Sequence, residues 1–237
     1  IGLILSSYSL PLAISKLIAA RRVHGKNQDV QRVFQAGLLF GLVAGGLMTL
    51  FLLFGADWIT VHIFNSPNSA LPLKVMAPTI LVFSIMGVVR GYFQGLGNMV
   101  PTSISQVIEQ VVNAVISVAA SFAFMHWFAN RETPAAYGAA GGTLGTLSGA
   151  LAAFVFLTLL MFVYRRQNAK ALRKPQADRL ESWSHVYTAL FLTLTPIILS
   201  QFVYQLSGSV DNSMFGFLMS GKGLTEKERL SLLGIYG

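Results

Sequence analysis

Polar side chains interrupt two apolar segments between Gly87 and Val112, and their types are those that bind anions and hydroxyl groups. In the first segment, Arg90 and Gln94 lie about one helical turn apart. In the second, four polar residues recur at the i, i+3, i+4 and i+7 spacing of one helix face: Gln106, Glu109, Gln110 and Asn113. A charge in hydrocarbon costs about 2.5–3.5 kcal/mol on insertion scales, so this spacing favours a polar path through a membrane.

The depths of Arg90 and Glu109 leave two interpretations of this hairpin open. If the turn at 97–100 marks the membrane surface, a rise of 1.5 Å per residue puts Arg90 about 10 Å deep and Glu109 about 12 Å deep. The two charges can therefore pair and simply hold the hairpin together, or at least one can face a wet cavity. Lys16, near the inner end of the first helix, is a further cavity candidate, or it snorkels to the surface.

Composition indicates an all-α, multi-pass membrane protein. Of the 237 residues, 54% are hydrophobic and only 11% are charged, which is too apolar for a soluble domain of this length. Neither end reads as a natural terminus, so we expect a fragment with about six transmembrane helices and the start of another. The expected spans are 1 to about 20, 34–58, 73–96, 101–128, 135–164 and 186–219.

The placement of the basic residues predicts the orientation of these helices. Ten of the seventeen Lys and Arg residues fall in the segments 21–33 and 165–185, which lie on one side if every apolar run spans the membrane. By the positive-inside rule that side is cytoplasmic, and topology then explains the net charge of +8 without nucleic acid. The second segment is expected to be either a surface helix anchored by Leu172, Leu180 and Trp183 or a solvated linker.

Two helices carry glycine at four-residue spacing. The positions are Gly37, Gly41 and Gly45 in one, and Gly141, Gly145 and Gly149 in the other. A stripe without side chains lets helix backbones approach, so we expect packing faces, with sliding between helices as the alternative.

The sequence offers no catalytic residue, metal site or cofactor site. It has no cysteine, its four histidines lack a partner at ligand spacing, and the phosphate-loop-like string at 216–223 has Gly223 where Ser or Thr is required. Asp211, near the outer end of the last expected span, is either a site for a coupling ion or part of a solvated helix end.

Three strings carry a family resemblance: SLPLAISKLIA at 9–19, RGYFQGLGNMVPTSISQVIEQ at 90–110 and GAAGGTLGTLSGALAAF at 138–154. They resemble the SpoVB/YtgP-like polysaccharide biosynthesis and export proteins of the multidrug/oligosaccharidyl-lipid/polysaccharide (MOP) exporter superfamily, to which MurJ-type lipid II flippases also belong. The resemblance covers nearly the whole chain. It departs at Asn113, where many relatives are expected to have a basic residue.

The resemblance implies a MATE/MOP-like bundle of two lobes in the bacterial inner membrane. It divides the chain into N-terminal lobe helices at 1–164, lacking the first helix of the lobe, a cytoplasmic basic linker at 165–185, and the start of the C-terminal lobe at 186–237. The implied partners are membrane lipids and an anionic lipid-linked oligosaccharide, moved by alternating access during envelope, peptidoglycan or sporulation processes. The alternatives are a cation-coupled multidrug exporter and a non-transporting scaffold for envelope or sporulation enzymes.

The charge asymmetry gives a first prediction about the full-length protein in intact cells. Single cysteines in place of Lys26 or Lys170 are expected to resist an impermeant thiol reagent added from outside, because both positions lie in basic segments. A cysteine in the short segment 129–134 serves as the control and should react. Strong labelling of the Lys26 or Lys170 position without permeabilisation would reverse the orientation.

Overall fold

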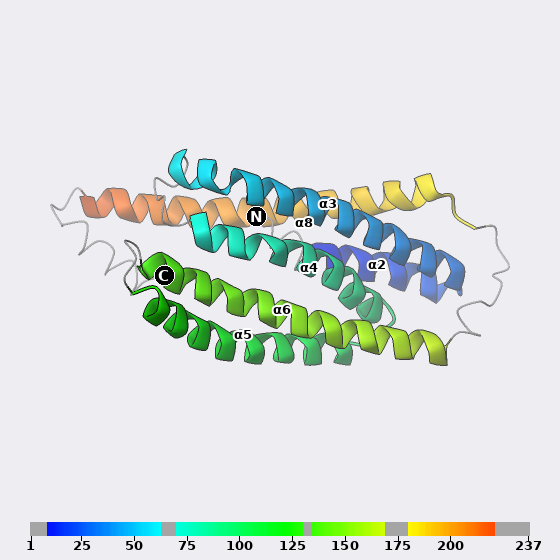
Figure 1. Cartoon of the computed structure of the whole chain (residues 1–237). Helices are drawn as coiled ribbons and strands as arrows, with labels where there is room; N and C mark the ends of the chain where they lie inside the picture. Colours follow the sequence, from blue (N-terminus) through cyan, green and yellow to red (C-terminus); the bar gives the residue numbers. More distant parts are fainter. Residues whose placement is uncertain (1–8, 63–69, 130–133, 169–179, 221–237) are drawn as a thin grey trace. The chain divides into compact units, whose positions relative to one another are not determined.

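The structure is a computed structural model, which describes residues 9–62, 70–129, 134–168 and 180–220, without the side chains of residue 135 and of residues 205–220. All regular structure in these ranges is helical (Figure 1). The helices are α2 (Leu10–Val23), α3 (Asn27–His62), α4 (Ala70–Gly95), α5 (Val100–Trp127), α6 (Pro134–Gln167) and α8 (Trp183–Ser220).

Five of these helices are long and apolar enough to cross a membrane: α3, α4, α5, α6 and the first part of α8. The remaining expected span, 1 to about 20, begins outside the described residues, and its described part lies in α2, which has 14 residues. The chain is therefore an all-α, multi-pass membrane protein, as its composition predicts. By compactness it divides at Leu194, so that Gly2–Leu194 form one unit and Thr195–Gly237, with Ile1, form another.

Local sequence signals end and start the helices. Gly25 and Gly97 have positive φ values of 69° and 76°, so each closes a tight turn in a conformation that other residues rarely adopt. After the second turn, Pro101 stands in the first turn of α5 and the Asn98 side chain accepts a hydrogen bond from the Val100 N–H at 3.1 Å.

The expected loop at 21–33 is much shorter than its charges suggested. Helix α2 continues to Val23 and α3 already begins at Asn27, so most of the basic residues lie on helix ends. The end turns of a spanning helix lie outside the hydrocarbon and can carry charge. A search for apolar runs therefore misses these charged end turns and makes the loop look longer than it is. In the 165–185 segment, α6 extends to Gln167, residues 180–182 are not helical and Trp183 starts α8; Leu172 lies outside the described residues.

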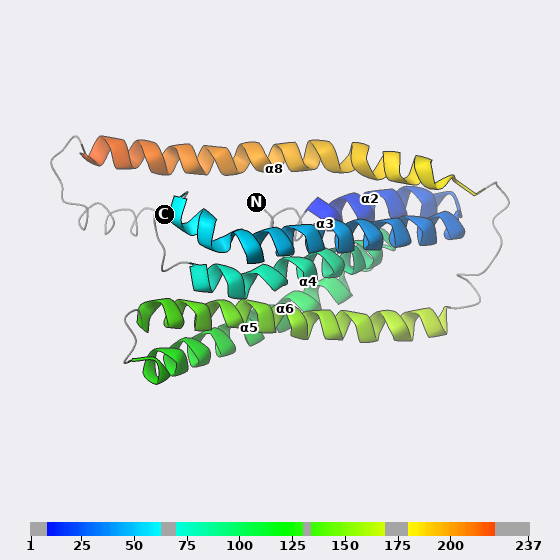
Figure 2. The same ribbon diagram turned by 45° about the horizontal axis from the view of Figure 1, so that its top comes forward.

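Helix α4 is the hub of the unit Gly2–Leu194. It packs against α2, α3 and α6, while α5 packs mainly against α6 and touches α4 only sparingly, as both ribbon views show (Figures 1 and 2). Helix α8 is not among the pairs with close backbone packing. The hairpin of α4 and α5 is thus splayed, and α6 contacts both of its arms.

The six glycines with four-residue spacing are buried at these contacts. A methyl group on Gly45 would lie 2.8 Å from Ser84 Cβ of α4, and one on Gly41 would lie 3.1 Å from the Ser84 carbonyl oxygen. On α6, a methyl group on Gly141 would lie 2.5 Å from the Ala120 carbonyl oxygen of α5. A further pair that the sequence analysis did not single out, Gly91 and Gly95 of α4, faces α2 in the same way.

The glycine contacts predict a position-specific loss of stability. Replacing Gly145 with Ala is expected to cost about 1–3 kcal/mol, the range for over-packed cores, because the new methyl group would lie 2.7 Å from the Ser117 Cα atom. Gly142→Ala is the matched control on the same helix, since nothing lies within 4 Å of its Cβ position. Thermal unfolding of the detergent-purified full-length variants measures both. Equal melting of the two variants would contradict the packing of α6 on α5.

Candidate functional site: two charge clusters

The first charge cluster joins α4 to α5 near their turn. Arg90 donates from Nη2 to Glu109 Oε2 at 2.8 Å and from Nε to Ser105 Oγ at 2.9 Å. Both charged side chains are largely withdrawn from the surface, with 6% and 12% of their area exposed. The ion pair between Arg90 and Glu109, one of the two possibilities left open by the sequence, is therefore formed in this structure. Ser105 is an additional partner of Arg90 that was not predicted.

The neighbouring polar residues extend this cluster toward the turn and along α5. Gln94 Nε2 lies 3.4 Å from Thr102 Oγ1, a long hydrogen bond one helical turn closer to the turn at 97–100. Gln106 and Gln110 are exposed on the outer face of α5. Glu109 of the pair and these two amides thus lie on neighbouring turns of α5.

The other predicted cavity residues lie elsewhere. Asn113 is half-buried toward α6, where its Oδ1 accepts from Ser117 Oγ at 2.8 Å and lies 3.5 Å from Thr146 Oγ1. Lys16 is exposed on α2. Asp211 is in α8, but its side chain lies outside the described ones.

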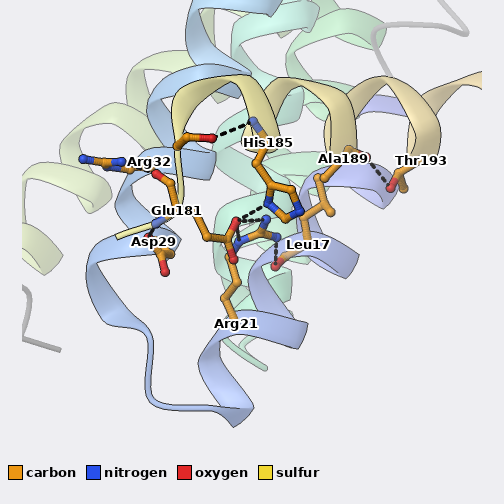
Figure 3. A network of polar contacts seen from close by, with 9 residues as sticks. Leu17, Arg21, Asp29, Arg32, Glu181, His185, Ala189 and Thr193 are labelled. Atoms are coloured by element: carbon orange, nitrogen blue, oxygen red, sulfur yellow. Dashed lines mark hydrogen bonds and ion pairs between the residues drawn. The ribbon is translucent and has the colours of Figure 1, made fainter. Parts of the chain in front are cut away.

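The second charge cluster, which we call the latch, consists of Arg21, Asp29, Arg32, Glu181 and His185 (Figure 3). Arg21 donates to Glu181 Oε2 from Nη2 at 2.5 Å and from Nε at 3.2 Å. The Glu181 N–H in turn donates to Asp29 Oδ1 at 3.0 Å, and its carbonyl oxygen accepts from Arg32 Nη1. Both the side chain and the backbone of Glu181 are therefore held by α2 and α3.

The first turn of α8 continues this docking. Ser182 accepts a hydrogen bond from the His185 N–H at 3.2 Å, which satisfies an otherwise unpaired donor at the start of the helix. His185 Nδ1 lies 3.3 Å from Glu181 Oε2, and Arg32 lies over the Trp183 ring with its guanidinium carbon 5.3 Å from the ring centre. The latch thus fixes the residues before α8 and the start of the helix together.

Electrostatics favour the charged form of Glu181. Partial burial pushes its pKa up, but the hydrogen bond and charge of Arg21, helped by His185, outweigh burial, so the pKa is lowered from the ordinary value of 4.5. The Asp29 charge opposes this shift only weakly. A lowered carboxyl pKa means that the folded protein prefers the ionised side chain.

The latch was not predicted from the sequence. Arg21 and Arg32 counted there only toward the basic segments that indicate topology, and Asp29 and Glu181 had no assigned role. A usable signal was present, because these two carboxylates stand in segments that are otherwise strongly basic. An acidic residue within a basic segment has cationic side chains nearby with which it can form an ion pair.

Neither cluster has the composition of a metal centre. Among the described residues, no group of three or more His, Cys, Asp or Glu side chains is arranged to hold a metal ion. What the described side chains of the two clusters offer is ion pairing and hydrogen bonding.

Comparison with known proteins identifies the family of the chain. It matches the family described as "Polysaccharide biosynthesis protein" over residues 2–236. The chain belongs to this family. The match agrees with the three strings at 9–19, 90–110 and 138–154, which carry the resemblance in the sequence.

Three relatives of this polysaccharide biosynthesis family member come from Bacillus subtilis (strain 168). Stage V sporulation protein B is 29% identical over 86% of the chain, the lipid II flippase MurJ is 25% identical over 98%, and the uncharacterized membrane protein YabM is 28% identical over all of it. The chain spans only 38%, 44% and 42% of their respective lengths. No solved structure gives a significant match.

The lowered pKa of Glu181 predicts a pH-dependent contribution to the stability of this family member. The latch should contribute fully above about pH 4.5, the ordinary value, and should be lost as the pH falls through the lowered native value. The melting temperature of full-length Glu181→Gln is therefore expected to lie below that of the parent at neutral pH, and the gap should close in more acidic buffer. Asp57→Asn, which breaks an exposed pair with Lys74, is the control and should show little effect. A gap that stays constant below pH 4.5 would contradict this assignment.

Proposed function

We propose that the chain is part of a transporter that moves a lipid-linked, anionic cell-envelope precursor across the bacterial inner membrane by alternating access. The relatives named as a flippase and a sporulation protein support this class of function. The observation that carries the proposal for this chain is the polar face of α5, with exposed Gln106 and Gln110 beside the Arg90–Glu109 pair.

The exposed surface of α5 is mixed: Val107, Val111 and Val115 lie beside Gln106 and Gln110, and the two amides support wet surroundings for this part of the helix. The exposed face of α3 between residues 38 and 56 carries only apolar side chains, and its buried Thr49 donates to the Ala77 carbonyl oxygen at 3.1 Å. Such a face suits lipid. An amide facing hydrocarbon has no partner, so polar residues in spanning helices normally face the bundle interior or a water-filled cavity.

Arg90 is the group best suited to the anionic part of such a cargo. In this proposal Glu109 is its resident counter-ion, which neutralises the buried guanidinium while the site is empty. A phosphate oxygen can take the place of the carboxylate on Arg90 because both accept charge-assisted hydrogen bonds from arginine. The displaced Glu109 carboxylate is then solvated by the water of the proposed cavity. Gln106 and Gln110 are then placed to bond to sugar hydroxyl groups.

The topology and the lobes belong to the same proposal. The ends of the helices that carry 21–33 and 165–185 face the cytoplasm, residues 1–164 belong to one lobe and 186–237 begin the other. Asp211 remains a proposed site for a coupling ion, and the partners are the precursor and membrane lipids, without nucleic acid, a cofactor or catalysis of bond formation.

A non-transporting scaffold is the second candidate, and one observation favours it. In a scaffold Arg90 and Glu109 need only pair with each other, and they do pair at 2.8 Å. A buried pair of this kind can fix the geometry of a hairpin without taking part in any transport step.

A set of full-length variants separates the two candidates. Arg90→Ala should destabilise the protein in either case, because it leaves a buried carboxylate without its partner, typically at a cost of about 3–5 kcal/mol. The double variant Arg90→Gln with Glu109→Gln removes both charges and should recover most of that stability. As a transporter it is expected to fold but to fail in a strain that depends on the protein.

Complementation and thermal stability are measured on the same variants. Ser103→Ala is the control on the same hairpin, since its exposed side chain bonds to the nearby Met99 carbonyl oxygen and was not assigned to the site. A double variant that is both stable and fully active would remove Arg90 from the cargo site and favour the scaffold.

A further inference from the structure

The start of α8 is attached to the rest of its unit in an unusual way. Helices α2 to α6 are joined by close backbone packing, whereas α8 is absent from those pairs. Its described contacts are made by side chains, among them the edge-to-face contact of Phe191 with Phe40 at 5.5 Å between ring centres. The latch is therefore a principal point at which the beginning of α8 is fixed to α2 and α3.

The latch brings together charges of both signs from three parts of the chain. α2 supplies Arg21, α3 supplies Asp29 and Arg32, and the segment entering α8 supplies Glu181. Arg21 and Asp29 are 7% and 0% exposed, whereas the His185 side chain is 67% exposed. The cluster therefore has both buried and exposed members, and it lies where the segment before α8 meets α2 and α3 (Figure 3).

A charged junction at a membrane end behaves differently from an apolar one. If the segment around Glu181 leaves α2 and α3, water can reach the freed carboxylates and guanidiniums and solvate them. Losing only one partner is worse, because the remaining charges stay buried and unpaired. Such a cluster therefore favours two states, fully docked or fully released, over intermediate ones.

After the latch, a stripe of buried apolar side chains on α8 shows how far the docked segment extends along the helix. Val186, Leu190 and Leu194 recur every four residues and are 0%, 1% and 1% exposed. The stripe ends at Leu194, which is also the last residue of the unit. Release of the latch would expose Val186 first, because it lies in the first turn of α8.

We propose that the latch is a conformational lock: it opens as one unit and releases residues 180–194 from α2 and α3 while the α2–α6 bundle stays packed. The purpose of this opening rests on the proposed function, because alternating access requires one group of helices to move against another. The opening itself does not depend on which cargo is carried, so it can be tested separately.

Thiol protection tests the lock directly in the full-length protein. The chain contains no cysteine, so Val186→Cys introduces a single buried reporter once any cysteine outside the chain is replaced by serine. Its rate of reaction with a soluble maleimide measures how often the segment opens. Adding Glu181→Gln is expected to raise this rate by roughly tenfold or more, because the buried Arg21 loses its charged partner.

Reporters in the bundle distinguish local release from general unfolding. Val33→Cys in α3 and Ala153→Cys in α6 are 1% and 0% exposed as the parent residues, and their rates should not change with Glu181→Gln. Asp57→Asn, which breaks the exposed pair with Lys74, should leave all three rates unchanged. If Glu181→Gln does not fold, Arg32→Gln carries the test, since it removes the described contacts of Arg32 to the Glu181 carbonyl and the Trp183 ring while keeping the Arg21–Glu181 pair.

Each outcome decides the proposal. Faster labelling at position 186 alone supports a lock that opens locally. An unchanged rate at position 186, or an equal rise at all three positions, overturns it. Either result stands whether or not the Arg90 variants support transport.

Discussion

Helices in a bilayer gain little by hiding apolar side chains from one another, because the lipid around them is equally apolar. Backbone approach and polar bonds must therefore hold this bundle together, and glycine makes the approach possible. Gly45 admits Ser84 of α4 to the surface of α3, and Gly95 admits Ile18 of α2 to the surface of α4. The position of α4 between its neighbours follows from these contacts.

The same constraint places the Arg90 pair. A methyl group on Gly149 would lie 2.5 Å from the carbonyl oxygen of Glu109, so α6 rests directly on the turn of α5 that carries this carboxylate. Helix α6 also packs against α4, which carries Arg90. Since α4 and α5 touch each other only sparingly, their charges meet because α6 supports both helices from one side. The packing face and the charged site are therefore parts of one arrangement.

How far the sequence predicted this arrangement depends on how local each signal is. Apolar runs predicted the spans, four-residue spacing identified the glycine faces, and the matched depths of Arg90 and Glu109 allowed their pair across a four-residue turn. The direction of Asn113 was not predictable, because one helix face is wide enough to offer two neighbours. The latch was not predictable either: Arg21 and Glu181 are 160 positions apart, and no periodicity relates residues on elements so distant in sequence.

The two charge clusters differ in what can replace their internal bonds. The latch lies where helices end, so bulk water is available to solvate its charges when it opens. Arg90 and Glu109 lie within spanning helices, with 6% and 12% of their side chains exposed, and separating them requires another ion or a wet cavity in their place. In the proposed transporter the latch therefore responds to movement of a segment, whereas the Arg90 pair responds to what enters the site. Coordinating movement with the arrival of an anionic cargo would need both kinds of response, and the two clusters that could supply them lie at separate positions in this chain.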